Sequence, residues 1–322
     1  MCYTFYSLFL LARTKSKLAK IGIPRSLGAS RFYGFWAEFF KTLGHDVLIA
    51  PETDRKIIAN ASEICEPELC LPAKIYIAQC RYLAKNGADA IFSPCYESSD
   101  PWIMPCPKVI AINDLVRSAV NNIPQILQPS VEMDIDEEMF SFVSLLKDRQ
   151  YGRQVAADSQ SYRKAYDKAL LSMKTPPFED QREKKFIALL GHSYVLNDPF
   201  LTKNILNIIK RYDLGNMIPD SLSWKDCKPH YKNAGLLQPL HWQLGRKIIG
   251  FSKYVSLKDN IAGAIYVSAF GCALDEVLSE AAHSIMKEKN IPFSFIMMDE
   301  HTQPANINVR VEAFLEICKK IR

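Results

Sequence analysis

Four cysteines stand where their thiolates could meet and bind a metal cluster. Cys70 opens the stretch 70–74 (CLPAK), Cys95 closes the segment 91–95 (IFSPC), Cys106 lies between two prolines, and Cys272 ends a Phe-Gly-Cys turn. Each is expected where a strand ends or a helix begins, and such positions converge at one edge of an α/β domain. Thiolates that arrive from different loops at one protected point are the ligands of iron–sulfur clusters. We therefore interpret these four cysteines as candidate metal ligands.

The spacing of the cysteines leaves two other interpretations open. The sequence has no C-x-x-C, so ferredoxin-like and zinc-ribbon patterns are absent. A catalytic thiol, or a cysteine packed as a small hydrophobe, is the alternative. Packing is the expected state of Cys2, Cys227 and Cys318, which lie in no supporting motif. The odd count of nine cysteines argues against a secreted disulfide scaffold.

The elements that position these cysteines follow from apolar periodicity and turn signals. In the first half we predict strands over residues 20–24, 46–50, 88–93 and 109–112, and helices over residues 32–43, 52–61 and 71–85. The helix at 32–43 carries an aromatic stripe that we expect in the core. In the second half we predict strands over residues 185–190, 264–268 and 293–298, and helices over residues 199–212, 242–254, 274–289 and from 308. This alternation predicts the α/β class with doubly wound parallel sheets.

The length of 322 residues is too great for one ordinary core and suggests two domains. Residues 134–174 are charged and mostly helical in pattern, without strand signals, and the sequence Thr-Pro-Pro at 175–177 breaks them. We therefore predict a first α/β domain with a helical linker over residues 20–175 and a second α/β domain over residues 184–322. Residues 1–19 form an N-terminal extension, whose apolar run 2–12 is too short to cross a bilayer.

Composition and charge exclude several classes of function. The chain is 48% hydrophobic and 23% charged, and its net charge of +5 is spread rather than clustered, so we expect no nucleic-acid partner. Basic residues follow the apolar run near the N-terminus, whereas a signal peptide carries them before it. We expect a cytoplasmic protein without a membrane span. No P-loop or G-x-G-x-x-G is present, so ATP or a dinucleotide would not bind by those routes.

Seven short motifs are spread over nearly the whole chain from residue 20. They are IGIPR at 21–25, CLPAK at 70–74, CPK at 106–108, GHSY at 191–194, GRKIIG at 245–250, FGC at 270–272 and DEHT at 299–302. In this order they resemble the 2-hydroxyacyl-CoA dehydratase superfamily (the 2-hydroxyglutaryl-CoA dehydratase D-component superfamily). The similarity is greatest to its branch of acyl-CoA dehydratase activase-related proteins. Each motif alone is weak, and the ordered set carries the resemblance.

The resemblance implies two flavodoxin-like domains, joined by a helical segment, with a cysteine-bound cluster between them. Family members carry a [4Fe–4S] cluster or, in one branch, a double-cubane cluster. By motif match, Cys70, Cys95 and Cys272 are the first three ligands, and Cys106 is the fourth. A double-cubane cluster would need further thiolates, for which the nearby cysteines at positions 65 and 80 are candidates.

The sequence also departs from the family pattern at two places. After FGC at 270–272 the family usually has Gly-Pro-Asp, whereas this chain has Ala273-Leu274-Asp275. The motif DEHT is followed by QPAN at 303–306 rather than by a glycine-bearing turn. Loss of a glycine where the backbone approaches a cluster would alter the site. We therefore expect the cluster to persist while the substrate range differs.

The function implied by the resemblance is electron transfer at low potential to a bound 2-hydroxyacyl-CoA, which is then dehydrated as by a lyase. A separate ATP-dependent iron–sulfur activator would supply the electron, and the partner would be a second copy or a related subunit. One alternative is a double-cubane or [4Fe–4S] reductase of small molecules that binds no acyl-CoA. Another is a non-catalytic electron-relay subunit. Four ligating cysteines would favour the relay, because no iron would then be open to a substrate.

Five further residues could serve such a site. Arg25 and Lys74 could neutralise an anionic cluster or a CoA phosphate, although isolated charges are often simply solvated. His192 lies at a strand-to-helix turn, where it could act as an acid–base group near neutral pH or cap the turn. Glu300 and His301 follow the last predicted strand and could handle protons or orient a ligand. Helix capping by the preceding aspartate is the competing interpretation.

Overall fold

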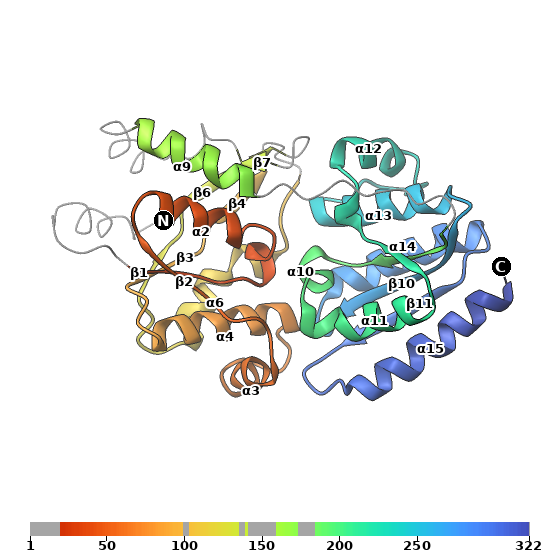
Figure 1. Ribbon diagram of the computed structural model, residues 1–322, viewed down its shortest axis with the longest axis horizontal. Coiled ribbons are helices and arrows are strands. Elements are labelled where there is room, and N and C mark those ends of the chain that lie inside the picture. Colours follow the sequence, from red (N-terminus) through yellow and green to blue (C-terminus); the bar gives the residue numbers. More distant parts are fainter. Residues whose placement is uncertain (1–19, 99–102, 135–138, 141–158, 173–183, 322) are drawn as a thin grey trace.

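The computed structural model describes residues 20–98, 103–134, 139–140, 159–172 and 184–321, and these contain two four-stranded parallel sheets that lie side by side (Figure 1). The first sheet has the order β2-β1-β3-β5, formed by β1 (Lys20–Ile23), β2 (Asp46–Ile49), β3 (Ala90–Phe92) and β5 (Gln125–Leu127). The second has the order β11-β10-β8-β9, formed by β8 (Phe186–Leu190), β9 (Gly215–Met217), β10 (Ile261–Ala269) and β11 (Phe293–Met298). In both sheets the first strand lies between the second and the third. The predicted α/β class with parallel sheets is confirmed.

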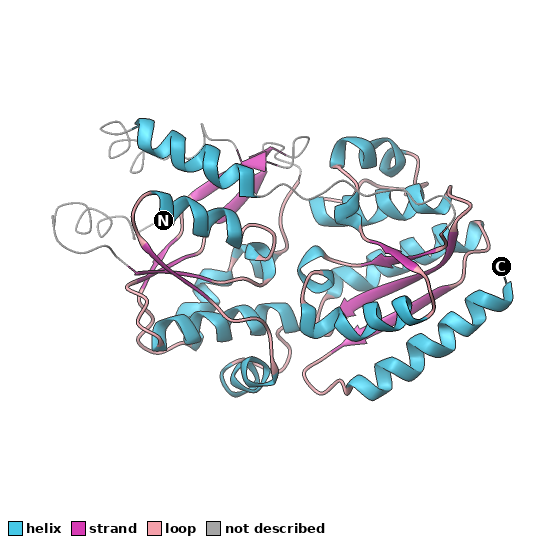
Figure 2. Cartoon of the chain, in the orientation of Figure 1, coloured by secondary structure: helices cyan, strands magenta, loops and turns pink. Residues whose placement is uncertain are grey.

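Helices cover both faces of each sheet (Figure 2). Around the first sheet lie η1 (Leu27–Ala29), α2 (Tyr33–Thr42), α3 (Arg55–Ile64), α4 (Leu71–Lys85), α5 (Pro107–Ile110), α6 (Ile112–Ala119) and α9 (Ser159–Ser172). Around the second lie α10 (Ser193–Leu196), α11 (Pro199–Arg211), η2 (Pro219–Ser221), α12 (Trp224–Lys232), α13 (Gln243–Ser256), α14 (Ala273–Glu288) and α15 (Pro304–Ile321). A small third sheet contains β4 (Cys95–Ser98), β6 (Ser130–Asp134) and β7 (Met139–Phe140).

The core explains why these segments adopt these elements. The aromatic stripe of α2 is buried against β3 and α9, as its helical spacing predicts (Phe32, Phe35, Trp36, Phe39 and Phe40). A second cluster joins the two halves of the chain, because Leu71 and Ile75 of α4 pack with Ile187 of β8 and Val267 of β10. The N-terminal end of α4, which contains Leu71 and Ile75, therefore packs against the second sheet. This packing brings its N-terminus to the junction between the two sheets.

Two segments differ from their predictions. Residues 109–112, predicted as a strand, lie in α5 and α6, because Pro107 stands in the first turn of α5 and favours a helix there. The fourth strand of the first sheet is instead β5, only three residues long. Within the predicted helical segment 134–174, α9 is confirmed, whereas β7 is a strand that the pattern did not indicate, and β6 ends at the first residue of the segment. Residues 1–19 and the predicted boundary at 175 lie outside the described residues.

Among the described residues, no helix combines the length and the apolar composition that crossing a membrane requires.

Candidate metal centre

Three of the predicted ligands come together at the junction between the two sheets. The amide of Leu71 donates to the carbonyl oxygen of Phe270 at 3.2 Å, which joins the Cys70 and Cys272 loops. Lys108 Nζ donates to the carbonyl oxygen of Gly271 at 3.0 Å, which brings the Cys106 loop to the same point. The charges of Cys106 and Asp275 act on the Cys70 thiol, and the charge of Cys70 acts on the Cys272 thiol. Cys70, Cys106 and Cys272 thus form one group.

Each cysteine of this group occupies the N-cap of a helix. Cys70 caps α4, Cys106 caps α5 and Cys272 caps α14, and none of the three side chains makes a capping hydrogen bond in the described structure. The backbone amides of Ala73 and Asp275 nevertheless act on the Cys70 and Cys272 sulfurs, and each of them works to lower the pKa of its thiol. The N-termini of the two long helices, α4 and α14, carry positive partial charge toward the group. This positive partial charge would favour an anionic cluster at the group.

Cys95 has other neighbours. It begins β4, its Sγ lies 4.0 Å from the side-chain amide nitrogen of Asn113, and its charge acts on Tyr76 and Tyr96. The structure places it at the carboxyl end of β3, as predicted, but against these residues. Of the two further candidates for a larger cluster, Cys80 is buried within α4, and Cys65 is partly buried at the C-terminal cap of α3.

Burial determines the protonation of the thiols in this group. It raises the pKa of Cys272, and the neighbouring carboxylate of Asp275 raises it further. It also raises the pKa of Cys70, where the charge of Lys108 acts in the opposite direction. Both thiols are therefore protonated at neutral pH when no metal is bound. A metal must displace these protons, because the thiolate is the ligand.

We expect metal uptake at this centre to increase with pH. The raised pKa values of Cys70 and Cys272 mean that protons compete with the metal up to alkaline pH, and this competition falls as the pH rises. The measurement is an anaerobic Co²⁺ titration followed by thiolate-to-cobalt absorption, from mildly acidic to mildly alkaline pH. The proton release is followed in parallel with an indicator dye. Uptake that stays constant over this range would contradict the expectation.

His192 and Asp275 lie beside Cys272 at the carboxyl ends of two adjacent strands. His192 follows β8, and Cys272 and Asp275 follow β10, so they flank the point where the strand order reverses. One ligand atom from each lies within 4.8 Å of the others. His192 Nε2 lies 3.3 Å from Asp275 Oδ1, and the imidazole stacks on the ring of Tyr194 with centroids 4.8 Å apart. The combination of N, S and O donors suits a transition metal.

Asp275 is held firmly in this position. Its carboxylate is completely buried and accepts hydrogen bonds from the Tyr266 hydroxyl at 2.7 Å and the Ser268 hydroxyl at 2.9 Å. Burial raises the pKa of Tyr266 well above its ordinary value, and the Asp275 charge adds to the effect, so the tyrosine remains a donor. Two neutral hydroxyls thereby stabilise a buried carboxylate.

Lys74 and Glu300 pair with each other. Lys74 Nζ lies 2.7 Å from Glu300 Oε1 and donates to the carbonyl oxygen of Pro67 at 2.8 Å, and its side chain is 1% exposed. Burial acts to raise the pKa of Glu300, but the hydrogen bond and charge of Lys74 outweigh it and leave the pKa below its ordinary value. The charge of Lys74 is thus balanced within the chain. The cation that acts on Cys70 is instead Lys108.

His301 is exposed, and its backbone amide donates to Asp299 Oδ1 at 2.8 Å. Asp299 also accepts a hydrogen bond from the Thr302 hydroxyl at 2.7 Å. Asp299 therefore stabilises a turn over residues 299–302 and does not cap α15, which begins only at Pro304. The motif positions Glu300 for Lys74 and leaves the imidazole of His301 at the surface.

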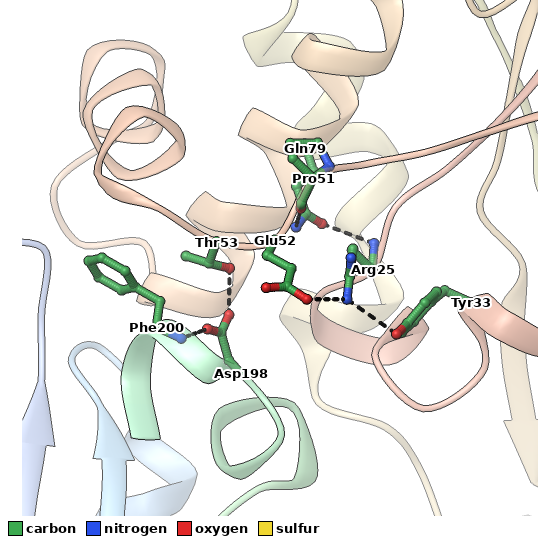
Figure 3. Close-up of polar contacts among 8 residues, drawn as sticks. All are labelled: Arg25, Tyr33, Pro51, Glu52, Thr53, Gln79, Asp198 and Phe200. Carbon is green, nitrogen blue, oxygen red and sulfur yellow. Dashed lines mark hydrogen bonds and ion pairs between the residues drawn. The ribbon is translucent and has the colours of Figure 1, made fainter. Parts of the chain in front are cut away.

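Arg25 belongs to a polar seam between the two halves (Figure 3). Its guanidinium lies 3.1 Å from Glu52 Oε1 and 3.2 Å from the Tyr33 hydroxyl, and its backbone amide donates to Gln79 Oε1 at 3.0 Å. Beside it the Thr53 hydroxyl donates to Asp198, which also caps α11. Arg25 is thus engaged at the carboxyl end of β1.

An apolar cavity of about 130 Å³ opens beside the group of Cys70, Cys106 and Cys272, of which Cys106 lines it. Cys106, His192 and Tyr194 contribute to its wall, together with aromatic and aliphatic side chains from both halves (Leu27, Tyr96, Trp224, Trp242 and Leu274). A small molecule in this cavity would lie next to Cys106 and His192. The cavity is therefore a candidate binding site adjoining the centre.

Sequence reasoning missed Asp275 and Lys108 as parts of the site. Asp275 is the aspartate that the family pattern places after FGC, and it is retained although the preceding glycine and proline are not. Lys108 ends the CPK motif. The motifs therefore contained both residues. The sequence did not show, however, that Asp275 lies beside Cys272 and His192 or that Lys108 lies beside Cys70, because these contacts depend on the fold.

Replacement of Gly271 by alanine is expected to destabilise the junction. Gly271 has φ +77°, and a methyl group there would lie 3.1 Å from Cys70 Cα and 3.2 Å from its nitrogen. Gly87 is a matched control, because its φ is +79° and a methyl group there meets nothing within 4 Å. We expect Gly87→Ala to cost about 1 kcal/mol from backbone strain alone and Gly271→Ala to cost clearly more. Chemical denaturation measures both, and equal losses would contradict the close contact.

Comparison with known proteins gives one family match. The model of a family described as "CoA enzyme activase uncharacterised domain" matches residues 20–222. The curated proteins contain no match. Among solved structures, the glycosyltransferase SnogD from Streptomyces nogalater is 11% identical, with 95% of this chain and 99% of that chain covered and a TM-score of 0.23. A likeness at this TM-score supports no conclusion about fold or function.

The family match overturns the main functional expectation from the sequence. We expected an iron–sulfur protein of the 2-hydroxyacyl-CoA dehydratase type, which would reduce and dehydrate its own substrate. The matching family is a domain of CoA enzyme activases, which points to the activator rather than to the dehydratase component. That expectation is wrong. The match fits better with the alternatives, among which is the relay.

Proposed function

Because this chain belongs to the family of the CoA enzyme activase domain, we propose that it is a non-catalytic electron-relay subunit of an activase system. The observation that carries the proposal is the meeting of Cys70, Cys106 and Cys272 at the N-termini of three helices. Its partner is a CoA-dependent enzyme that receives the electron. The two sheets then represent two flavodoxin-like domains, residues 20–175 and 184–322, with the centre between them.

The donor set fits a [4Fe–4S] cluster. Three soft thiol ligands would arrive from separate loops, of which Cys70 is buried and Cys106 and Cys272 are partly buried. The N-termini of α4 and α14 and the ammonium group of Lys108 supply positive charge for an anionic cluster. When bound, the cluster accepts and releases one electron. The protein contributes the ligands, the burial and the electrostatic setting.

The test is anaerobic reconstitution of the purified chain, followed by iron and sulfide analysis and EPR of the reduced protein. We expect about four iron and four sulfide per chain and a paramagnetic signal that disappears on oxidation. The reduced chain should then be oxidised by a CoA-dependent acceptor enzyme without forming a product of its own. Protein that remains free of iron and sulfide after reconstitution would overturn the proposal.

A reductase of small molecules is the second candidate, favoured by the apolar cavity beside Cys106 and His192. Trp224 and Trp242 contribute to its wall, so a ligand in the cavity would change their fluorescence. Titration with small apolar compounds tests for such binding. A ligand that both quenches this fluorescence and is consumed by the reduced protein would favour the reductase over the relay.

A further inference from the structure

His192 is a buried histidine whose Nδ1 has no hydrogen-bond partner among the described residues. Its side chain is 2% exposed, and Nε2 lies 3.3 Å from Asp275 Oδ1 without hydrogen-bond geometry. His192 occupies the N-cap position of α10, but its side chain makes no capping hydrogen bond within the described chain. Burying an imidazole in this way is costly, and buried polar groups are normally satisfied. The ring is therefore placed to bind something that arrives from outside the chain.

The surroundings of His192 identify what it would bind. A ring nitrogen, the Cys272 sulfur and an Asp275 oxygen lie within 4.8 Å of one another. Histidine ligands of metals commonly orient one ring nitrogen toward a carboxylate and bind the metal through the other. Nε2 faces Asp275 Oδ1 at 3.3 Å, and the carboxylate is itself fixed by two hydroxyl donors. This arrangement leaves the second ring nitrogen for a metal.

We propose that His192 is the fourth protein ligand of the cluster, beside Cys70, Cys106 and Cys272, with Asp275 orienting its ring. This inference rests on the proposed relay function and specifies its site. Every iron of the cluster then has a protein ligand, which suits a relay because no iron is open to a substrate. Cys95, which lies against Tyr76, Tyr96 and Asn113, is not needed. A neutral imidazole in place of a thiolate also raises the reduction potential of the cluster.

The test uses the full chain, labelled with ¹⁵N-histidine and reconstituted anaerobically, in wild-type form and as His192→Ala, His192→Cys and the control His283→Gln. His283 is half-exposed on α14. Pulsed EPR of the reduced cluster is expected to show a strongly coupled histidine nitrogen in the wild type and in His283→Gln. We expect the coupling to be lost in both His192 variants. His192→Cys should retain the iron and sulfide and have a lower reduction potential than the wild type.

The relay function and the role of His192 as a ligand would be overturned by different results. Wild-type protein with full iron and sulfide but without a histidine coupling would overturn the role of His192 and leave the relay intact. Wild-type protein without iron and sulfide would overturn both. A coupling that persists in His192→Cys would also overturn the assignment, and this variant remains informative if His192→Ala folds poorly.

Discussion

Replacement of Cys272 by alanine is expected to reduce the iron and sulfide content of the reconstituted chain from about four of each to nearly none. Cys272 is the cysteine that connects the two halves of the proposed ligand set. Its loop contacts Cys70 through Gly271 and Phe270, and its thiol lies beside Asp275. Loss of this sulfur removes a ligand at the end of β10, where the chain offers no other thiol between residues 228 and 317.

Two control variants make this result specific. Cys318→Ala removes a cysteine that is buried in the core of the second sheet, and it should leave the metal content unchanged. Cys95→Ala removes the predicted ligand that lies against other neighbours, and it should also retain the cluster. Iron and sulfide analysis with EPR measures all three variants. Cys272→Ala protein that still holds a full cluster would contradict the ligand set.

Replacement of Lys74 by methionine is expected to lower the free energy of unfolding by about 3–5 kcal/mol, the usual cost of removing one partner from a buried ion pair. Methionine retains most of the side-chain volume, so the loss arises mainly from the charge. Lys74 is 1% exposed, and Glu300 would be left partly buried without its ammonium partner. The second oxygen of Glu300 is already buried without a hydrogen-bond partner among the described residues. No other described group would therefore replace the lost ammonium group of Lys74 at this carboxylate.

Lys168→Met is the matched control for this loss. Lys168 pairs with Glu38 at the same 2.7 Å, but its side chain is 60% exposed, and surface pairs contribute about 0–1 kcal/mol. The double variant Lys74→Met/Glu300→Gln should recover part of the stability, because it leaves no unpaired charge. Denaturant titration of the four proteins measures these values. Similar losses for Lys74→Met and Lys168→Met would show that burial of the pair has no energetic effect.

The pair also affects the response to acid. The pKa of Glu300 is lowered in the folded protein, so the unfolded chain binds a proton at this carboxyl more readily than the folded chain does. The contribution of Glu300 to stability is therefore present above the ordinary carboxyl pKa and is lost as the pH falls through the lowered value. In Glu300→Gln this part of the acid sensitivity disappears.

Local features of the sequence were sufficient to predict much of the fold. The helix predicted over residues 71–85 has the same bounds in α4, and the strand over 293–298 has the same bounds in β11. Cys70 and Cys106 precede prolines in first helical turns, which is a local signal. The position of Cys272 directly after an apolar strand pattern is also a local sequence signal. Three cysteines could therefore be assigned to element ends before the fold was known.

Contacts between distant segments could not be predicted in this way. Lys74 and Glu300 are 226 residues apart. The sequence presents Lys74 as an isolated charge and Glu300 as a proton-handling group, and neither motif indicates that the two residues pair. The neighbours of Cys95 depend on how the chain passes from β3 in the first sheet to β4 in the third sheet. No local sequence pattern specifies this path. The function was misjudged for a related reason: the motifs indicate a candidate ligand set, and such a set could serve either a catalyst or the protein that supplies its electron.

The proposed centre would take ligands from both halves of the chain, and this has a kinetic consequence. Cys70 and Cys106 belong to the first half, and Cys272 and His192 to the second, so separation of the halves would break the ligand set and speed the loss of a bound metal. In native protein, the rate of iron removal would then measure how often this separation occurs. Variants that weaken the polar seam of Arg25, Glu52, Thr53 and Asp198 should release iron faster while each sheet remains folded.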